Sequence, residues 1–173
     1  MLNFIKAERD TNEMIIAKNQ AMAIIDLYPE IFPHLYKQGH LLEKYITKGN
    51  IILQDGVVIT FSKYKNHRKM SKNATTYIKR GDFILHQIAN IDQHNGNAKK
   101  VLNEFIEYCK SQYSENLFLT VRKHNDKAVQ FYFKRGFVKD SDIIWTSKKD
   151  GIIPGIVFRL RLVADKNIET ICI

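Results

Sequence analysis

The sequence predicts a mixed α/β layer structure, built as one domain over residues 1–173. Strand-like and helix-like segments alternate along the chain, with a β-hairpin in the first half and a strictly alternating apolar segment near the end. No internal repeat, low-complexity block or linker interrupts this order, so the elements are expected to share one layered structure. Hydrophobic residues make up 45% of the 173 residues, which is enough to bury a core.

The first third of the chain is expected to be mostly helical. A short strand is predicted over 2–5, and a helix follows in which Asp10 can act as the cap. Apolar residues then recur at helical spacing as far as Tyr28, and Pro29 ends this pattern. A second, mostly helical stretch is predicted between this proline and Gly49.

The middle of the chain combines a hairpin, a basic stretch and a strand. Two segments rich in β-branched residues, 51–53 and 57–62, flank Gln54-Asp55-Gly56, and an Asp-Gly pair in this position predicts a β-hairpin. A polar and strongly basic stretch then covers 63–80. The apolar segment 83–91 is expected to be the fourth strand of the sheet.

Helices and strands alternate in the second half of the chain. A single apolar stripe predicts the first of these helices, and Gly136 is expected to end the second. The last strand alternates apolar and polar residues, so it should be half-buried, and as an edge strand it could pair with a second copy to give a homodimer. The predicted elements are a helix over 98–113, a strand over 117–121, a helix over 125–135, an extended segment from Phe137, a connection over 151–155 and a strand over 156–163.

Composition narrows the class of protein. The formal net charge of +9 favours anionic partners such as a phosphorylated cofactor or nucleic acid. Cys109 and Cys172 suggest neither a disulfide framework nor a metal site, and the histidines lack metal-ligand spacing, so no metal is expected. Because no signal-like or membrane-length apolar segment occurs, we expect a soluble, cytoplasmic protein.

Residues 93–98 form the candidate binding turn, between a predicted strand and a predicted helix. Free backbone N–H groups at a helix start favour an anion, and Gly96 would let a phosphate approach the backbone closely. Lys99 and Lys100 add positive charge in the first helical turn. Taken alone, a turn with one glycine more often only connects a strand to a helix and binds no ligand. The Walker and dinucleotide spacings are also absent.

Two motifs in this region resemble those of the GNAT superfamily of acyltransferases. The family's acyl-CoA turn has Gln or Arg, two residues, Gly, one residue, then Gly or Ala. The chain matches it with Gln93-His94-Asn95-Gly96-Asn97-Ala98, and departs from common family residues at Asn90, His94 and Asn95. The second and more specific match is a strand from Leu119, Asn125, a helix with Ala128 and Phe131-Tyr132, then Gly136-Phe137.

The resemblance implies a fold and an activity. The fold would be a mostly antiparallel central sheet that splays between its fourth and fifth strands and is flanked by about four helices. The activity would be that of an N-acetyltransferase, which moves an acetyl group from acetyl-CoA to a primary amine of an unidentified acceptor. The pantetheine arm would lie along the fourth strand, where a backbone N–H near Ile88 or Ala89 stabilises the oxyanion.

The same resemblance implies roles for individual residues. The pyrophosphate would be surrounded, mainly by main-chain N–H groups, by Gln93, His94, Asn95, Gly96, Asn97 and Ala98. Tyr132 would protonate the departing CoA thiolate, because a tyrosine with a pKa of about 10 stays protonated at neutral pH. The alternative for Tyr132 is core packing, since Phe131 and Phe133 flank it.

Two further roles stay open at this stage. Asn125 would hydrogen-bond the cofactor arm, cap the following helix, or do both. His86 on the fourth strand is the best-placed general base, with Asp82 and Asp92 as alternatives that could instead mark strand ends.

The acceptor is not specified by the sequence. In the basic stretch 63–80, Tyr64 and Tyr77 lie among the positive charges, as nucleic-acid binding would require, although a solvated loop has the same composition. Two alternatives are therefore kept: a GNAT-like protein that modifies nucleic acid or tRNA, and a non-catalytic module that binds CoA or nucleic acid. Trp145 could be a pocket wall or a core anchor.

Overall fold

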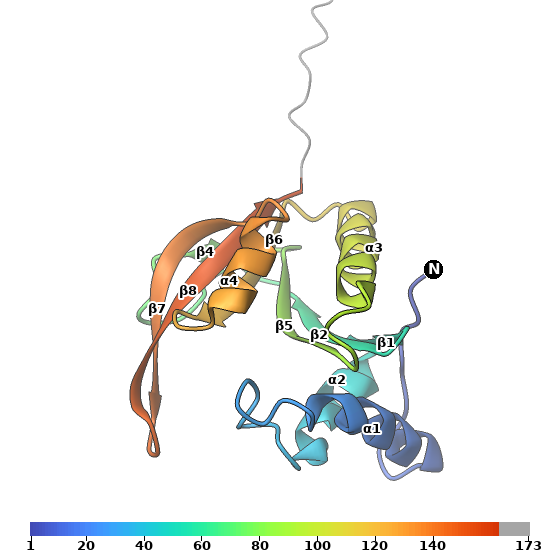
Figure 1. Ribbon diagram of the computed structural model, residues 1–173. Coiled ribbons are helices and arrows are strands. Elements are labelled where there is room, and N and C mark those ends of the chain that lie inside the picture. Colours follow the sequence, from blue (N-terminus) through green and yellow to red (C-terminus); the bar gives the residue numbers. More distant parts are fainter. Residues whose placement is uncertain (163–173) are drawn as a thin grey trace, which may run out of the picture. The chain divides into compact units, whose positions relative to one another are not determined.

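The computed structural model describes residues 1–162 of the chain (Figure 1). Its helices are α1 (Asn12–Ile25), the 3₁₀ helix η1 (Gly39–Leu42), α2 (Glu43–Lys48), α3 (Asn97–Ser111) and α4 (Asp126–Phe133). Its strands are β1 (Ile51–Gln54), β2 (Val57–Lys63), β3 (Arg68–Lys69), β4 (Tyr77–Ile78), β5 (Phe83–Asn90), β6 (Asn116–Arg122), β7 (Val138–Ser147) and β8 (Gly151–Arg161). Cys172 and Val163, the end of the predicted last strand, lie outside the described residues.

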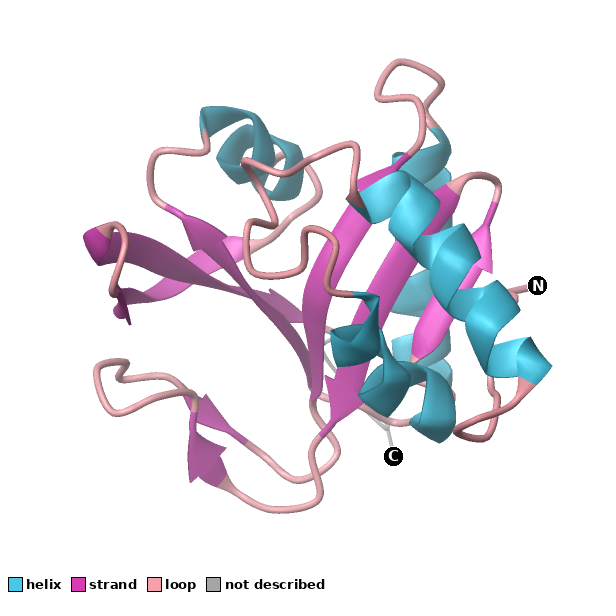
Figure 2. Ribbon diagram, turned by 90° about the horizontal axis from the view of Figure 1, so that it is seen from below, coloured by secondary structure: helices cyan, strands magenta, loops and turns pink. Residues whose placement is uncertain are grey.

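The predicted mixed α/β fold is confirmed. Six strands form one mostly antiparallel sheet in the order β1-β2-β5-β6-β8-β7. The basic stretch forms a separate two-stranded ribbon of β3 and β4, which Figure 2 shows as a short pair of strands joined by a long loop. The chain divides into two compact units. Unit 1 comprises 1–62 and 85–107, and unit 2 comprises 63–84 and the described residues from Tyr108 onward.

In unit 1, strand β2 is buried on both faces. All residues from Val57 to Phe61 are buried, which explains why this segment is apolar without alternation. One face, with Val58, packs into a core cluster with α1 and α2. On the other face Phe61 packs against Phe105 of α3, with ring centroids 5.0 Å apart.

The start of the chain differs from two sequence predictions. The segment 2–5 forms only one isolated β-bridge, from Phe4 to Ile52, rather than a strand. Helix α1 is capped by Thr11, whose side chain accepts a hydrogen bond from the N–H of Met14, and not by Asp10. Asp10 has a φ of 59°, in the left-handed region, whereas an N-cap residue is typically extended.

The predicted hairpin of β1 and β2 is confirmed. Gln54 pairs with Val57, so Asp55 and Gly56 form a two-residue turn. Their φ angles of 51° and 71° are both positive, as a type I′ turn requires.

In unit 2, the antiparallel strands β6, β8 and β7 carry structure on both faces. Tyr132 of α4 packs on Phe158 of β8, with ring centroids 6.5 Å apart. Successive side chains of a strand point to opposite faces, so Val157 lies on the other face. There it joins a core cluster with Phe118 of β6 and Ile78 of the ribbon.

The connection predicted over 151–155 is wrong, because these residues belong to β8. They continue the pairing with β7, from Ser147 opposite Gly151 to Ile143 opposite Gly155. Because β8 also pairs with β6, it is an inner strand and not the edge strand that the sequence predicted. Gly155 is therefore a strand residue and not a turn residue. A Cβ at Gly155 would lie 2.2 Å from a ring carbon of Trp145, so the missing side chain makes room for the indole.

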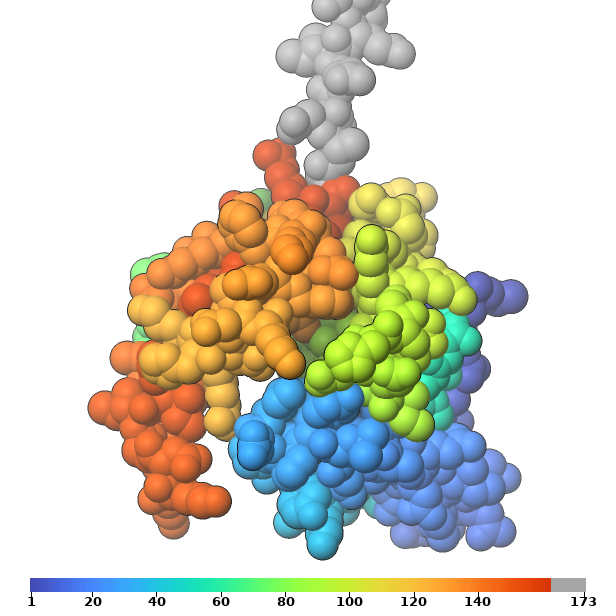
Figure 3. Space-filling view, viewed as in Figure 1, coloured from blue at the N-terminus to red at the C-terminus, as the bar shows by residue number. Residues whose placement is uncertain are grey.

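Trp145 also packs against the core cluster of unit 2, in agreement with the core-anchor interpretation. The exposed tip of the β7–β8 hairpin extends beyond the rest of this unit (Figure 3).

We expect Gly155→Ala to destabilise the protein by about 1–3 kcal/mol, because the added methyl group overpacks the site under the Trp145 ring. Urea unfolding measures this change. In a Trp145→Leu background the same substitution should cost less, because the ring has been removed. An equal cost in both backgrounds would show that the close approach of the indole is not the reason for this glycine.

Candidate functional site

In unit 1, residues 91–96 connect the end of β5 to the start of α3. Gly96 has a φ of 75°, a conformation that favours glycine, and no atom lies within 4 Å of the place that a Cβ would occupy. Within residues 1–162, the backbone N–H groups of Gly96, Ala98 and Lys99 have no hydrogen-bond acceptor. The first intrahelical bond runs from the N–H of Lys100 to the carbonyl of Gly96. Free N–H groups at a helix start are suited to an anion.

The side chains of the turn fix its shape. The Asn95 amide oxygen accepts hydrogen bonds from the N–H of Asn97 and from the side-chain amide of Asn90, each at 2.9 Å. The N–H of His94 donates to the carboxylate of Asp92, also at 2.9 Å. These bonds use the N–H groups of His94 and Asn97. The other N–H groups at the start of α3 stay available.

The β1–β2 turn supports this loop and the start of α3. The carbonyl of Gly56 accepts a hydrogen bond from the N–H of Ile91 at 2.8 Å. The carbonyl of Asp55 accepts from the side-chain amide of Asn97 at 2.9 Å, and its carboxylate lies 3.0 Å from the ammonium group of Lys100. The hydrogen bond to Asp55, with its charge, raises the pKa of Lys100. The positive charge of Lys100 is therefore paired within the protein.

Tyr28 also supports the end of β5. The sequence indicated only that this residue belongs to an apolar stripe. Its hydroxyl donates a hydrogen bond to the carbonyl of Asn90, where β5 ends. Burial raises the pKa of Tyr28, and this outweighs the opposite effect of its hydrogen bond with Gln93. The hydroxyl therefore remains a donor and anchors the end of the strand.

His86 lies half-buried in β5. Its Nε2 atom is 2.9 Å from the hydroxyl oxygen of Ser62, and its ring lies 5.5 Å from that of Tyr45. Burial, together with the positive charge of Lys44, lowers the pKa of His86 from 6.5 to about 4. The imidazole is thus neutral at neutral pH and able to accept a proton.

The other predicted residues of β5 lie where the sequence placed them. Ile88 and Ala89 both belong to the strand, and Ala89 packs into the core cluster with α1 and α2. Of the alternative bases, Asp92 is exposed and accepts from the turn. Asp82, in unit 2, is buried and accepts hydrogen bonds from the N–H groups of Lys79 and Asn116, which ties the loop before β5 to the start of β6.

In unit 2, Asn125 caps α4 by accepting a hydrogen bond from the N–H of Ala128 at 3.2 Å. The predicted capping role is confirmed. Tyr132 is 5% exposed, and its ring packs between those of Phe131 and Phe137. Burial raises the pKa of Tyr132, so its hydroxyl stays protonated.

The predicted site residues therefore fall into two groups. Unit 1 holds His86, Ile88, Ala89 and the turn 93–98, and unit 2 holds Asn125 and Tyr132. In the part of the chain that the structure describes, no three His, Cys, Asp or Glu side chains are grouped as metal ligands would be. Over the same residues, every helix is too short or too polar to cross a membrane.

Comparison with protein families identifies the class of this domain. The family described as acetyltransferase (GNAT) domain matches residues 60–152, more than half of the chain. The chain belongs to the GNAT acetyltransferase family. The matched segment includes all the predicted site residues of this GNAT protein.

Solved structures show the same fold. The ribosomal-protein-S18-alanine N-acetyltransferase of Escherichia coli is 16% identical with a TM-score of 0.62, over 97% of this chain and 99% of that chain. A GNAT-family acetyltransferase of Bacillus cereus is 15% identical with a TM-score of 0.59, over 95% and 99%. Chaetomium thermophilum Naa20, in complex with a bisubstrate analogue, is 12% identical with a TM-score of 0.60, over 84% and 82%. A search of curated proteins gave no match.

The low pKa of His86 predicts that this GNAT protein loses stability as the pH falls. Between pH 6.5 and about 4 the unfolded chain binds a proton at this histidine that the folded chain does not bind. One pKa unit corresponds to about 1.4 kcal/mol, so the loss should reach about 3 kcal/mol. Urea unfolding at several pH values measures it.

A His86→Gln variant should retain this stability on acidification, whereas His67→Gln, at an exposed histidine, should behave as the wild type. Equal pH dependence of the wild type and His86→Gln would contradict the assigned pKa.

Proposed function

We propose that this GNAT protein transfers an acetyl group from acetyl-CoA to a primary amine. The observation that carries the proposal is the turn 93–98, with its open glycine and its free N–H groups at the start of α3. In unit 1 this turn follows β5 directly. A pyrophosphate is the group whose charge and size suit several converging N–H donors at a helix start. Lys99, exposed in the first turn of α3, adds a positive charge.

The acetyl group would be activated by the backbone of β5. As the pantetheine arm lies along this strand, the N–H of Ile88 or Ala89 donates to the thioester carbonyl. Negative charge develops on that oxygen when the amine attacks, and a fixed donor stabilises the charge more in the transition state than in the ground state. No side chain is needed for this step.

His86 is the proposed general base. The attacking amine becomes positively charged as its nitrogen bonds to the carbonyl carbon, and a proton must then leave the nitrogen. The imidazole is unprotonated and positioned by Ser62. With a pKa of about 4 it retains a proton only briefly at neutral pH, so it would pass the proton on to water.

Tyr132 is the proposed general acid. When the tetrahedral intermediate collapses, the carbon–sulfur bond breaks and the CoA thiolate leaves with the electron pair. The raised pKa of Tyr132 keeps its hydroxyl protonated at neutral pH, so it can deliver a proton to the thiolate. Tyr132 would then regain a proton from solvent.

An amine is the acceptor class that this chemistry suits. The Escherichia coli structure with this fold is named for N-acetylation of an alanine of ribosomal protein S18. A neutral base and an uncharged acid match the removal of one proton from an amine and the delivery of one proton to a thiolate.

Acetyl-CoA should stabilise the wild-type protein against heat, and Gly96→Glu should abolish this effect by placing a carboxylate in the turn. At ligand near 100 times its dissociation constant, linkage gives about 2.7 kcal/mol. For a domain of this length that is a rise in Tm of roughly 5–10 °C. Gly151→Glu is the matched control, because Gly151 also has a positive φ and open space around it. Loss of the shift in both variants, or no shift in the wild type, would argue against acetyl-CoA at this turn.

Tyr132→Phe should lower kcat about 100-fold or more, in line with the usual contribution of a general acid. Acetyl-CoA binding and thermal stability should change little, since phenylalanine keeps the ring that packs against Phe131 and Phe137. Steady-state kinetics with a set of primary amines, together with the thermal shift, separates these effects. Unchanged kcat would leave Tyr132 with a packing role only.

A further inference from the structure

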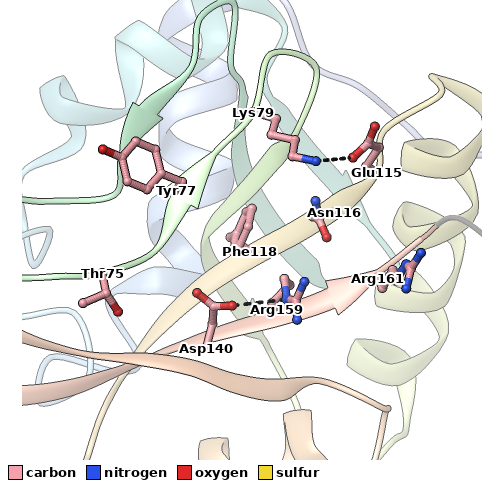
Figure 4. Close-up of a pocket in the computed structure, with 9 residues that line it drawn as sticks. All are labelled: Thr75, Tyr77, Lys79, Glu115, Asn116, Phe118, Asp140, Arg159 and Arg161. Atoms are coloured by element: carbon pink, nitrogen blue, oxygen red, sulfur yellow. Dashed lines mark hydrogen bonds and ion pairs between the residues drawn. The ribbon is translucent and has the colours of Figure 1, made fainter.

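Unit 2 contains a polar pocket that none of the roles above uses. Its volume is about 530 Å³, within the range of small-molecule sites. The pocket lies between the β3–β4 ribbon and the ends of β6, β7 and β8 (Figure 4). Arg159 of β8 lines it, whereas the preceding Phe158 packs on Tyr132 of α4. Alternate residues of a strand point to opposite faces, so the pocket is on the face of β8 turned away from α4.

Charged groups of both signs line the pocket. Three cations line it, Lys79, Arg159 and Arg161, against two carboxylates, Glu115 and Asp140. Lys79 lies 3.0 Å from Glu115, as Figure 4 shows. The lining of the pocket therefore carries one more positive than negative charge.

Arg159 is the second cation of the pocket that lies beside a carboxylate. Its Nε atom lies 3.2 Å from an Asp140 carboxylate oxygen, close enough for an ion pair. The geometry does not make a hydrogen bond, however, and this buried N–H is left without an acceptor among the described residues. The other Asp140 oxygen accepts a hydrogen bond from the hydroxyl of Thr76. Asp140 thus contacts both Arg159 and Thr76, and the Arg159 side chain, 40% exposed, keeps part of its surface open to a ligand.

Two aromatic rings complete the pocket. Phe118 is 2% exposed and forms part of its floor. Tyr77 of β4, in contrast, is 63% exposed although it borders the pocket. An exposed ring beside cations is the arrangement on which a nucleic-acid base stacks while its phosphate is neutralised.

The ribbon extends this positive surface beyond the pocket. Between residues 63 and 80 there is no Asp or Glu. Every cation of this segment is exposed: Lys63, Lys65, Arg68, Lys69, Lys72, Lys79 and Arg80. The guanidinium of Arg68 lies 5.3 Å from the centre of the Tyr64 ring, so a second aromatic residue is paired with a cation along the ribbon.

We propose that the pocket and the ribbon bind single-stranded nucleic acid, with one nucleotide seated in the pocket. Its base stacks on Tyr77, its phosphate lies against Lys79 and Arg159, and neighbouring phosphates follow the cations of the ribbon. An acidic peptide would use the same cations but would leave the Tyr77 ring without a flat partner. A free nucleotide offers the same chemistry as one unit of a strand, and the test distinguishes the two sources.

The test measures the fluorescence anisotropy of labelled single-stranded RNA and DNA of about 12 nucleotides, at several salt concentrations. Tyr77→Ala should weaken binding about fivefold or more without changing the dependence on salt, because stacking releases no counterions. Lys79→Gln should instead reduce the slope of log affinity against log salt by about 0.7, the effect of one phosphate contact on a single strand.

Two matched controls keep the comparison specific. Phe133→Ala removes a similarly exposed ring, 68% exposed, from α4, and Lys149→Gln removes an exposed charge from the β7–β8 turn. Both should bind as the wild type does. Tight binding of adenosine monophosphate by calorimetry, lost in Tyr77→Ala, would support the pocket with a free nucleotide as its ligand.

Three results would overturn the proposal: no binding of either probe at low salt, equal weakening by Tyr77→Ala and Phe133→Ala, or equally tight binding of a poly-glutamate peptide. None of these measurements involves acetyl-CoA, so they stand apart from the proposed transferase activity.

Discussion

The left-handed turn at Asp55 and Gly56 is the constraint on which the proposed cofactor loop depends. Both residues have positive φ, which turns their carbonyls toward the loop that follows β5. Because Gly56 has no side chain, the Ile91 side chain occupies the space that a Cβ would need, 2.4 Å away. The same turn binds Asn97 and Lys100 at the start of α3. A hairpin turn early in the chain thus fixes the geometry of free N–H groups far along the sequence.

Burial prepares the two proposed catalytic groups in opposite senses. In unit 1 the low dielectric around His86 disfavours its charged form, so the imidazole loses its proton. In unit 2 the same effect on Tyr132 disfavours the phenolate, so the hydroxyl keeps its proton. Burial therefore favours an unprotonated base and a protonated acid at neutral pH. Charged neighbours contribute less than burial: Lys44 further lowers the pKa of His86, and Arg135 opposes the rise in the pKa of Tyr132.

The sequence predicted the features that depend on local signals. The Asp-Gly hairpin, the helix after Gly96 and the Asn125 cap all follow from a few neighbouring residues. Predictions failed where distant contacts decide the outcome. Gly155 looks like part of a turn until the Trp145 ring across the hairpin is known. The contacts of Tyr28 and Asp55 with the proposed cofactor loop join residues too far apart in the chain for periodicity or motif spacing to indicate them.

Asn90 and Asn95, at which the chain departs from the common GNAT turn, act together in the structure. Asn90 stands where the family often has proline, and Asn95 lies within the turn itself. Their side chains hydrogen-bond to each other at 2.9 Å, and Asn95 also accepts from the N–H of Asn97. A proline at position 90 would restrict the backbone where β5 ends, and here an amide pair holds the same point instead. Because replacing either residue alone would leave the other amide short of a partner, the two positions are expected to change together.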